Sequence, residues 1–502
     1  MAQMNVPDLV RIGTMPSNTE ISIETDVLDP VIHTQNFCRF QLQNKGILHS
    51  HSKIVLRMKP GVDADSNGFF PLNVGVHSLI QRCSLRIGTK TVCEIDDFNH
   101  YIGYKSMFLS NEHQKQREQY VSGRMISHKP YMDDGIAFMG GSSDVSAPTV
   151  GIDIGVAPFK KLKTEAMATD GVIELRNFQV TNQTYGPEFT VALADLFPFL
   201  YTNQLPLYMM KEPVTIELTF APALRDRMCV TRTDAQGKSF EIATAHTQLI
   251  ADYQYYPNEI MEEYAAQNND LSMSYVDYRL SKRTMTVTAA SGAAAATGSQ
   301  IINVGGAGRI ASKVITMLSR QDQSDNSLLN NYHAFGCDRD YSGTPASDNN
   351  GTLTSNLKYN DQLLYPVDLT NPAVQFHYLV QAEGMVPFVT REEYSFQGDT
   401  TTAVGILGEY AGDPAKGVIA QNANLEGAVD TASQGLVNQF FYNAYQLNRN
   451  ERVNERGIEL IVNYDPLKNL GAGTSDNYTL RSYIEMSRVM RLVDGMAQVF
   501  FA

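Results

Sequence analysis

The sequence lacks any long hydrophobic run and any secretory signal. No apolar stretch approaches the ~18 residues that a membrane-spanning helix needs. The first twenty residues, MAQMNVPDLVRIGTMPSNTE, have no charged region followed by an apolar core. We therefore expect no membrane-spanning segment and folding in a cytosol-like compartment.

Cysteine is scarce, and its spacing matches no known framework. The five cysteines are Cys38, Cys83, Cys93, Cys229 and Cys337, an odd number with no CxxC pair. A disulfide scaffold is therefore not expected, and a reducing site of folding fits better. Cys38 and Cys83 fall on the inward phase of predicted strands, which predicts buried core thiols.

Positive charge is also in deficit. The chain carries 40 Lys and Arg against 54 Asp and Glu, a formal net charge of −14. The densest basic stretch is the short Lys160–Lys163. Because nucleic-acid backbones are recognised mainly through clustered basic side chains, sequence-specific binding of nucleic acid is not expected.

The usual signals of catalysis and ligand binding are incomplete. His49 and His51 lie two residues apart on a predicted strand, but no third metal ligand is adjacent. A row of polar side chains explains them as well as a metal does. Residues 304–309 (VGGAGR) are glycine-rich but lie between β segments, which predicts a turn rather than a phosphate-binding loop. Residues 237–239 (GKS) resemble the end of such a loop, yet Arg232 occupies the position of the required glycine.

The many carboxylates show no convergent pair. Glu217 and Glu459 are interpreted as residues on the solvent-facing side of strands, and no nucleophile-elbow signature is present. The sequence therefore predicts no catalytic residue, no cofactor-binding residue and no metal ligand. The expectation is a protein that is not an enzyme and needs no cofactor.

What the sequence does contain is a series of short alternating runs separated by turn residues, typical of an all-β protein. In Val214–Phe220 the residues at even positions are apolar, and Pro213 and Pro222 bracket the run. Ile458–Tyr464 repeats this pattern, and Ile458 lies 242 residues after Ile216, close to half of 502. The spacing predicts two similar halves.

The chain order predicts an arm and two domains. Residues 1–33 are expected to form an extended arm, residues 34–265 the first domain and residues 266–502 the second. The clearest helix is predicted over Asp96–Gln119, and a short helical segment around Phe376–Val380 echoes it in the second half. Strands are predicted over Ile47–Met58 and Glu259–Tyr264, and also at Tyr275–Val287 and Leu480–Val493.

Three long polar excursions interrupt this pattern, at residues 122–170, 320–361 and 397–437. Segments of this length are usually functional or contact neighbouring molecules. We therefore expect them to contribute to an oligomer. With roughly eight short strands in each half, the count fits two consecutive jelly-roll β-sandwiches, each of two four-stranded sheets.

Several stretches taken together resemble the double jelly-roll major capsid proteins of virophages, polinton-like viruses and nucleocytoplasmic large DNA viruses. The early strand pair over 37–58, containing NKGILHSHSK, carries the resemblance together with the helix after the third strand. So do residues 196–222 and the segment YVDYRLS at 275–281. The similarity spans nearly the whole chain in order.

This resemblance implies a structural protein of the virion. Such proteins form homotrimers with a pseudo-hexameric outline, which tile an icosahedral shell around a DNA genome. The implied partners are further copies of the chain, penton proteins and minor or cement proteins, with an internal membrane possible nearby. Assembly inside the host cell is implied as well. The alternative is an all-β carbohydrate-binding or receptor-binding protein of the adhesin or tail type.

The predicted arm, Met1–His33, suggests a role in assembly. It has no core of its own, and Arg11 is its only Lys or Arg. We expect it to lie along a neighbouring surface and clip adjacent trimers rather than bind the genome.

Overall fold

The computed structural model describes most of two β-sandwiches and the helices between their strands. It describes residues 21–60, 66–69, 75–105, 121–122, 177–180, 188–221, 229–230, 240–288, 295–320, 336–337, 352–366, 372–383, 439–440, 442–447, 451–468 and 475–501.

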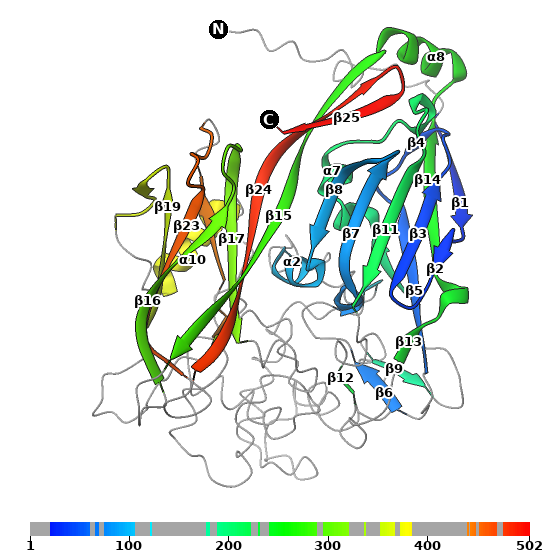
Figure 1. Cartoon of the computed structure of the whole chain (residues 1–502). Coiled ribbons are helices and arrows are strands. Elements are labelled where there is room, and N and C mark those ends of the chain that lie inside the picture. The colour runs from blue at the N-terminus through cyan, green and yellow to red at the C-terminus, as the bar shows by residue number, and fades with distance from the viewer. Residues whose placement is uncertain are drawn as a thin grey trace, which may run out of the picture.

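The first sandwich, roll 1, consists of two facing antiparallel sheets (Figure 1). One has the order β1-β14-β5-β10, made of Ser22–Leu28, Gln248–Tyr255, Lys53–Pro60 and Glu188–Ala192. The other has the order β3-β11-β7-β8, made of Phe37–Leu42, Val214–Phe220, Ile80–Ile87 and Lys90–Asp96. Short strands extend them: β2 (Ile32–His33), β4 (Ile47–Leu48) and β13 (Phe240–Ile242).

The second sandwich, roll 2, repeats this plan with longer strands. Its first sheet has the order β15-β24-β17-β22, made of Asp270–Thr288, Ser475–Val493, Ala311–Arg320 and Tyr442–Gln446. Its second has the order β16-β23-β19-β20, made of Ala295–Gly305, Ile458–Lys468, Thr352–Tyr359 and Gln362–Leu363. The last strand, β25 (Met496–Phe501), pairs with β24.

Both rolls have the same strand connectivity. If the eight main strands of each are counted along the chain, one sheet always holds the first, eighth, third and sixth, and the other the second, seventh, fourth and fifth. This is the jelly-roll order, so the predicted fold class is confirmed. The predicted equivalence of Val214–Phe220 and Ile458–Tyr464 is confirmed as well, because β11 and β23 are both the seventh strand.

The pairing of β11 explains why its sequence is so regular. It lies between β3 and β7, and its four apolar residues are at most 1% exposed: Val214, Ile216, Leu218 and Phe220. Each such side chain contributes roughly 1.5–3 kcal/mol by burial. The intervening Glu217 lies on the outer face, 2.6 Å from Arg39 and 3.4 Å from Arg86.

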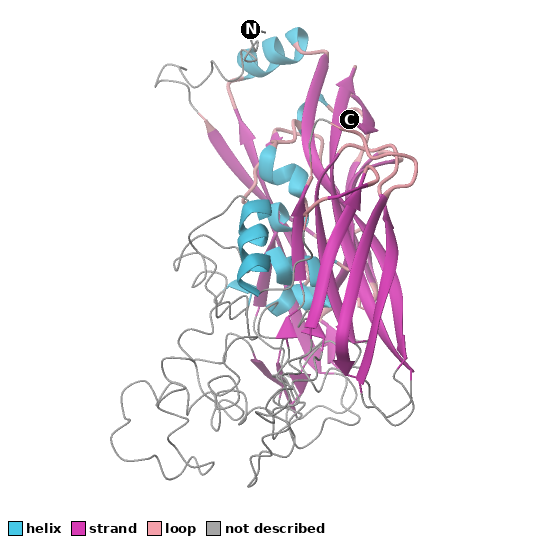
Figure 2. Ribbon diagram, turned by 90° about the vertical axis from the view of Figure 1, so that its left-hand side faces the viewer, coloured by secondary structure: helices cyan, strands magenta, loops and turns pink. Residues whose placement is uncertain are grey.

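The helices lie in the connections and gather along one side of the strands (Figure 2). Helix α2 (Phe98–Lys105) and helix α10 (Pro372–Glu383) both follow the fifth strand of their roll. The predicted echo between these two segments is therefore confirmed. The connection before β11 holds α6 (Leu193–Leu196), α7 (Pro198–Thr202) and the 3₁₀ turn Leu207–Met209. Two further 3₁₀ turns span Gly75–Leu79 and Thr244–His246.

Five small strands form two side sheets. The first pairs β6 (Ser66–Phe69) with β9 (Asn177–Val180) and β12 (Cys229–Val230). The second pairs β18 (Gly336–Cys337) with β21 (Gln439–Phe440).

Three sequence predictions are wrong. Residues 22–28 of the predicted arm are β1, the first strand of roll 1. No residue of β1 is buried, so the strand lacks the alternating buried apolar residues that mark the other strands. The predicted strand Glu259–Tyr264 lies within helix α8 (Asn258–Gln267), which follows Pro257 and buries only Met261. The predicted strand Ile47–Met58 is two strands, β4 and β5, separated by a turn at residues 49–52.

Other predictions are only partly testable. The predicted helix Asp96–Gln119 is observed over Phe98–Lys105, and residues 106–119 lie outside the described residues. The excursions 122–170 and 397–437 lie outside them too, apart from residue 122, whereas the end of the excursion 320–361 is the strand β19. The division of the chain after residue 265 stays a prediction; α8 ends at Gln267 and β15 begins at Asp270.

Candidate functional site

The most elaborate group of side chains in the described residues lies at the contact between the two rolls, which we call the seam. The strands β15 and β24 pair continuously over nineteen residues each. One end of this ribbon belongs to roll 2, and the other extends beside β8 and α7 of roll 1 (Figure 1). The apolar part of the seam includes Tyr275, which packs edge-on against Phe199 at a centroid distance of 5.0 Å.

A buried charge cluster lies where α2, α10 and β17 meet. The carboxylate of Glu383 accepts hydrogen bonds from Tyr104 Oη at 2.8 Å and from Lys105 Nζ at 2.9 Å. Lys313 Nζ lies 3.1 Å from Glu383 Oε2 and 3.1 Å from Glu485 Oε2. Ser312 Oγ and Tyr278 Oη, both at 2.6 Å, complete the donors to Glu485. Two lysines and two glutamates are thereby matched in charge.

The cluster is stable in its charged form because each charge has a partner. Burial of Glu383 opposes ionisation, but the attraction of Lys105 and Lys313 outweighs it and lowers the pKa of Glu383 to about 2. The pKa of Glu485 is also lowered, since Lys313 and the Ser312 hydroxyl outweigh its burial. The pKa of Lys105 is lowered, because its burial outweighs the attraction of Glu383. At neutral pH the carboxylates of this cluster are ionised.

A second group of charges centres on Asp97, at the turn before α2. Asp97 Oδ2 lies 3.1 Å from Arg481 Nε and 3.2 Å from Lys282 Nζ, both of roll 2. Tyr483 Oη donates a hydrogen bond of 2.8 Å to the Asp97 backbone carbonyl. Burial of Asp97 is outweighed by the attraction of Arg481 and Lys282, so its pKa is lowered. With φ at 45°, Asp97 adopts the left-handed conformation that short polar residues tolerate best.

A third group joins β15 to β8. Arg488 Nη1 donates to Asp277 Oδ2 at 2.6 Å and to the Val92 carbonyl at 3.0 Å. Tyr275 Oη donates to the same carbonyl at 2.6 Å, and Cys93 Sγ lies 3.4 Å from Asp277 Oδ1. Here burial dominates, and the pKa of Asp277 is raised despite the arginine. The three groups fix the angle and register of one roll against the other.

This arrangement is suited to holding the two rolls together. In each group every carboxylate is engaged by a cation of the protein. Among the described residues, no three His, Cys, Asp or Glu side chains are placed to hold a metal ion. No helix of the described part is long and apolar enough to cross a membrane.

The residues singled out in the sequence do not meet at the seam. His49 and His51 lie in the turn between β4 and β5, not on one strand face as predicted. Their rings are 4.3 Å apart, and His49 Nδ1 accepts a hydrogen bond from the backbone of His51. Glu459 is paired with Lys358 at 3.3 Å. Glu217 lies on the outer face of β11, as predicted, with its side chain 11% exposed between two arginines.

The remaining candidates have structural roles or lie outside the described residues. Cys38 and Cys83 are fully buried in the core, as predicted for core thiols, and burial raises the pKa of both. Residues 306–309 lie in the turn between β16 and β17, as predicted, and residues 304–305 are the end of β16. Residues 237–239 lie outside the described residues, which resume with strand β13.

Sequence reasoning missed the seam. A signal was present, because Asp277, Lys313 and Glu485 interrupt apolar strand patterns where a core residue is expected. The charges of the seam meet across segments that are far apart in the chain; Arg481 and Asp97, for example, are 384 positions apart. Only the folded chain identifies which charges meet.

A separate surface consists of exposed apolar side chains along the edge of roll 1. Ile23 and Val27 alternate along β1 and are 60% and 58% exposed. Ile21, Val31 and Ile32 are also exposed nearby along the chain. Because β1 is an edge strand, its outer side also leaves backbone groups available for a partner. We call these five residues the β1 patch.

Comparison with known proteins gives a match by structure only. No protein-family model and no curated protein matches the sequence. Among solved structures, a capsid chain of the virus PBCV-1 is 12% identical with a TM-score of 0.50, covering 96% of this chain and 97% of that one. The major capsid protein of mavirus is 11% identical with a TM-score of 0.46, covering 97% and 90%. A Faustovirus major capsid protein is 9% identical with a TM-score of 0.47, covering 96% of this chain and 94% of that one. At the level of fold, the likeness to the PBCV-1 chain confirms the predicted double jelly-roll resemblance.

Proposed function

We propose that this chain is a viral major capsid protein, the repeating structural unit of an icosahedral shell around a DNA genome. The observation that carries the proposal is the pair of jelly rolls with identical strand order, joined by a buried seam into one unit. The PBCV-1 capsid chain, which shares this fold over nearly its full length, supports it. Such a two-roll unit gives a trimer an almost sixfold outline, which suits close packing in a shell.

The proposal includes a homotrimer. The β1 patch supports it, because exposed apolar rows on an edge strand are usually covered by a partner. An obligate interface of this kind buries upwards of ~2,000 Å². The expected partners beyond the trimer are neighbouring trimers, penton proteins and minor or cement proteins, and the expected location is the virion, after assembly inside the host cell.

Light scattering coupled to size-exclusion chromatography tests the proposal directly. The purified chain at micromolar concentration should elute with three times the 55.7 kDa mass of one chain. Negative-stain images should show particles with a six-sided outline. A monomer that binds glycans under the same conditions would favour an adhesin-type protein instead.

The proposal also holds that the chain catalyses no reaction. Screens for hydrolase or nucleotide-turnover activity should give no saturable turnover. Turnover that one carboxylate or histidine substitution abolishes would contradict the structural role.

A further inference from the structure

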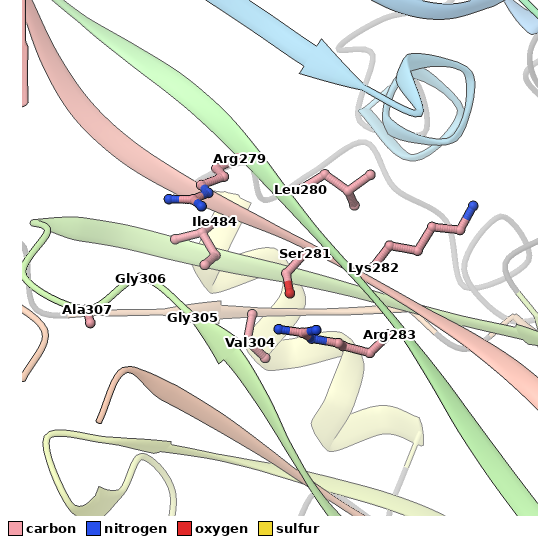
Figure 3. Close-up of a pocket in the computed structure, with 10 residues that line it drawn as sticks. All are labelled: Arg279, Leu280, Ser281, Lys282, Arg283, Val304, Gly305, Gly306, Ala307 and Ile484. Atoms are coloured by element: carbon pink, nitrogen blue, oxygen red, sulfur yellow. The ribbon is translucent and has the colours of Figure 1, made fainter. Parts of the chain in front are cut away.

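Roll 2 contains a basic pocket whose arginines take no part in the seam. It has a volume of about 470 Å³, within the range of ligand pockets, and lies between the edge strands β15 and β16. Its lining residues come from three segments (Figure 3): Arg279, Leu280, Ser281, Lys282, Arg283, Val304, Gly305, Gly306, Ala307 and Ile484.

The arginines of this pocket lie on the inner face of the edge strand β15, and both are exposed. Along β15, Arg279, Ser281 and Arg283 share one face with Met285 and Val287, and those two are buried in the core of roll 2. Figure 3 shows Ser281 and Arg283 directed toward Val304, whereas Lys282 is directed away. Lys282 belongs to the seam through Asp97. Because both arginines are exposed at the edge of the sheet, their guanidinium groups are accessible to a ligand in the pocket.

The pocket leaves its polar groups without partners inside the described chain. Neither Arg279 nor Arg283 has an ion-pair partner among the described residues. Both guanidinium groups are therefore available to an anion that enters the pocket.

The opposite wall leaves room for a bound chain. β16 is irregular between Asn303 and Gly305, and a Cβ at Gly305 would meet no atom within 4 Å. Glycine at an irregular strand position commonly marks the close approach of another group to the backbone. Val304 and Ile484 supply apolar contacts beside the arginines.

We propose that this pocket binds an acidic peptide segment of another protein chain, whose carboxylates pair with Arg279 and Arg283. Arginine binds carboxylates through two parallel hydrogen bonds, which makes such a pair specific in geometry. With a net charge of −14, the chain repels long polyanions, so a short acidic segment fits two arginines better than a nucleic acid does. That the segment belongs to a neighbouring chain of the shell rests on the proposed capsid function.

Fluorescence anisotropy of the full-length protein with labelled hexaglutamate tests the assignment, with labelled hexaglutamine as the neutral probe. The wild type should bind hexaglutamate only. The double variant R279Q/R283Q should raise the Kd at least about tenfold, because each charged hydrogen-bonded pair carries about one order of magnitude in affinity. The control K53Q/K211Q removes the same charge from two exposed lysines outside the pocket and should leave the Kd unchanged.

Several results would overturn the pocket. One is the absence of any measurable affinity of the wild type for hexaglutamate, and another is an equal rise of the Kd in both double variants. A third is displacement of the peptide by inorganic phosphate beyond the effect of NaCl at equal ionic strength, which would indicate a site for free anions. If R279Q/R283Q does not fold, R279K/R283K keeps the charge but loses the paired geometry, and it should weaken binding several-fold. Light scattering on the same samples separates the two proposals, because these substitutions should not change the oligomeric state.

Discussion

Glu383 links the two rolls, because its carboxylate pairs with Lys105 of roll 1 and with Lys313 of roll 2. A buried ion pair adds little compared with a well-packed apolar pair, but removal of one partner leaves a buried charge uncompensated. The residues of the seam are therefore expected to be far less tolerant of substitution than charged pairs on the outer sheet faces.

The substitution Glu383→Gln should lower the free energy of unfolding by about 3–5 kcal/mol, because two lysines lose their shared counter-charge. Denaturant unfolding followed by tyrosine fluorescence measures it. The control is Glu459→Gln, which breaks a surface pair with Lys358 and should cost no more than about 1 kcal/mol. Equal effects from both would mean that the seam cluster is solvated in solution.

The pKa of Glu383 also predicts how stability depends on pH. Its pKa is about 2 in the folded chain and near its ordinary value of 4.5 in the unfolded chain. The stabilisation is therefore complete above pH ~4.5 and is lost as the pH falls toward 2. Glu485 and Asp97, with lowered pKa values, act in the same direction, whereas the raised pKa of Asp277 opposes them.

Thermal unfolding measured between pH 5 and pH 2 checks this dependence. The melting temperature of the wild type should fall steadily over this interval, and that of Glu383→Gln should fall less. A parallel decline in both proteins would assign the acid sensitivity to other carboxylates.

At the scale of elements, the turns decide how the long strands meet. The turn that enters β23 places Gly457 at φ +79°, and a Cβ there would lie 2.9 Å from the carbonyl oxygen of Gly305. The turn after β16 contains Gly308 at φ +70°, where a Cβ would meet nothing within 4 Å. The two glycines share the left-handed conformation and differ in the available space.

That difference gives a prediction. Gly308→Ala should cost about 1–2 kcal/mol of stability from backbone strain alone. Gly457→Ala should cost clearly more, because the clash with Gly305 displaces the start of β23. Melting temperatures of the two variants, measured side by side, test the order. If the Gly308 variant were the less stable one, the packing at this turn would be misassigned.

At the scale of the whole molecule, the exposed β1 patch is the surface that we expect a second chain to cover in the proposed trimer. The double substitution Ile23→Lys and Val27→Lys keeps the backbone pairing of β1 with β14 but places charge on the edge, a common barrier to edge association. The proposed trimer should then dissociate into folded monomers, as light scattering and circular dichroism would show.

The matched control is Ile301→Lys on the edge strand β16 of roll 2, where the side chain is 66% exposed. This variant should remain trimeric. Trimers that persist in the Ile23 and Val27 variant would remove the β1 patch from the interface.

The sequence by itself determined the architecture of this protein. Alternation in Val214–Phe220 and Ile458–Tyr464 marked the same strand of two rolls, because a strand with one buried face must repeat its apolar residues every second position. The order of such strands along the chain was enough to predict two jelly rolls. Where burial was weak, as in β1 and in α8, the pattern was absent and the predictions were wrong.

Only the tertiary structure decided how the rolls are joined and where a ligand could enter. Asp97 and Arg481 are 384 positions apart, and no local pattern links them. Arg279 and Arg283 lie on β15, and only the placement of Val304 and Gly305 beside them forms a pocket. Periodicity records which face of an element is buried, whereas the pairing of charges depends on distances that exist only after the elements have packed.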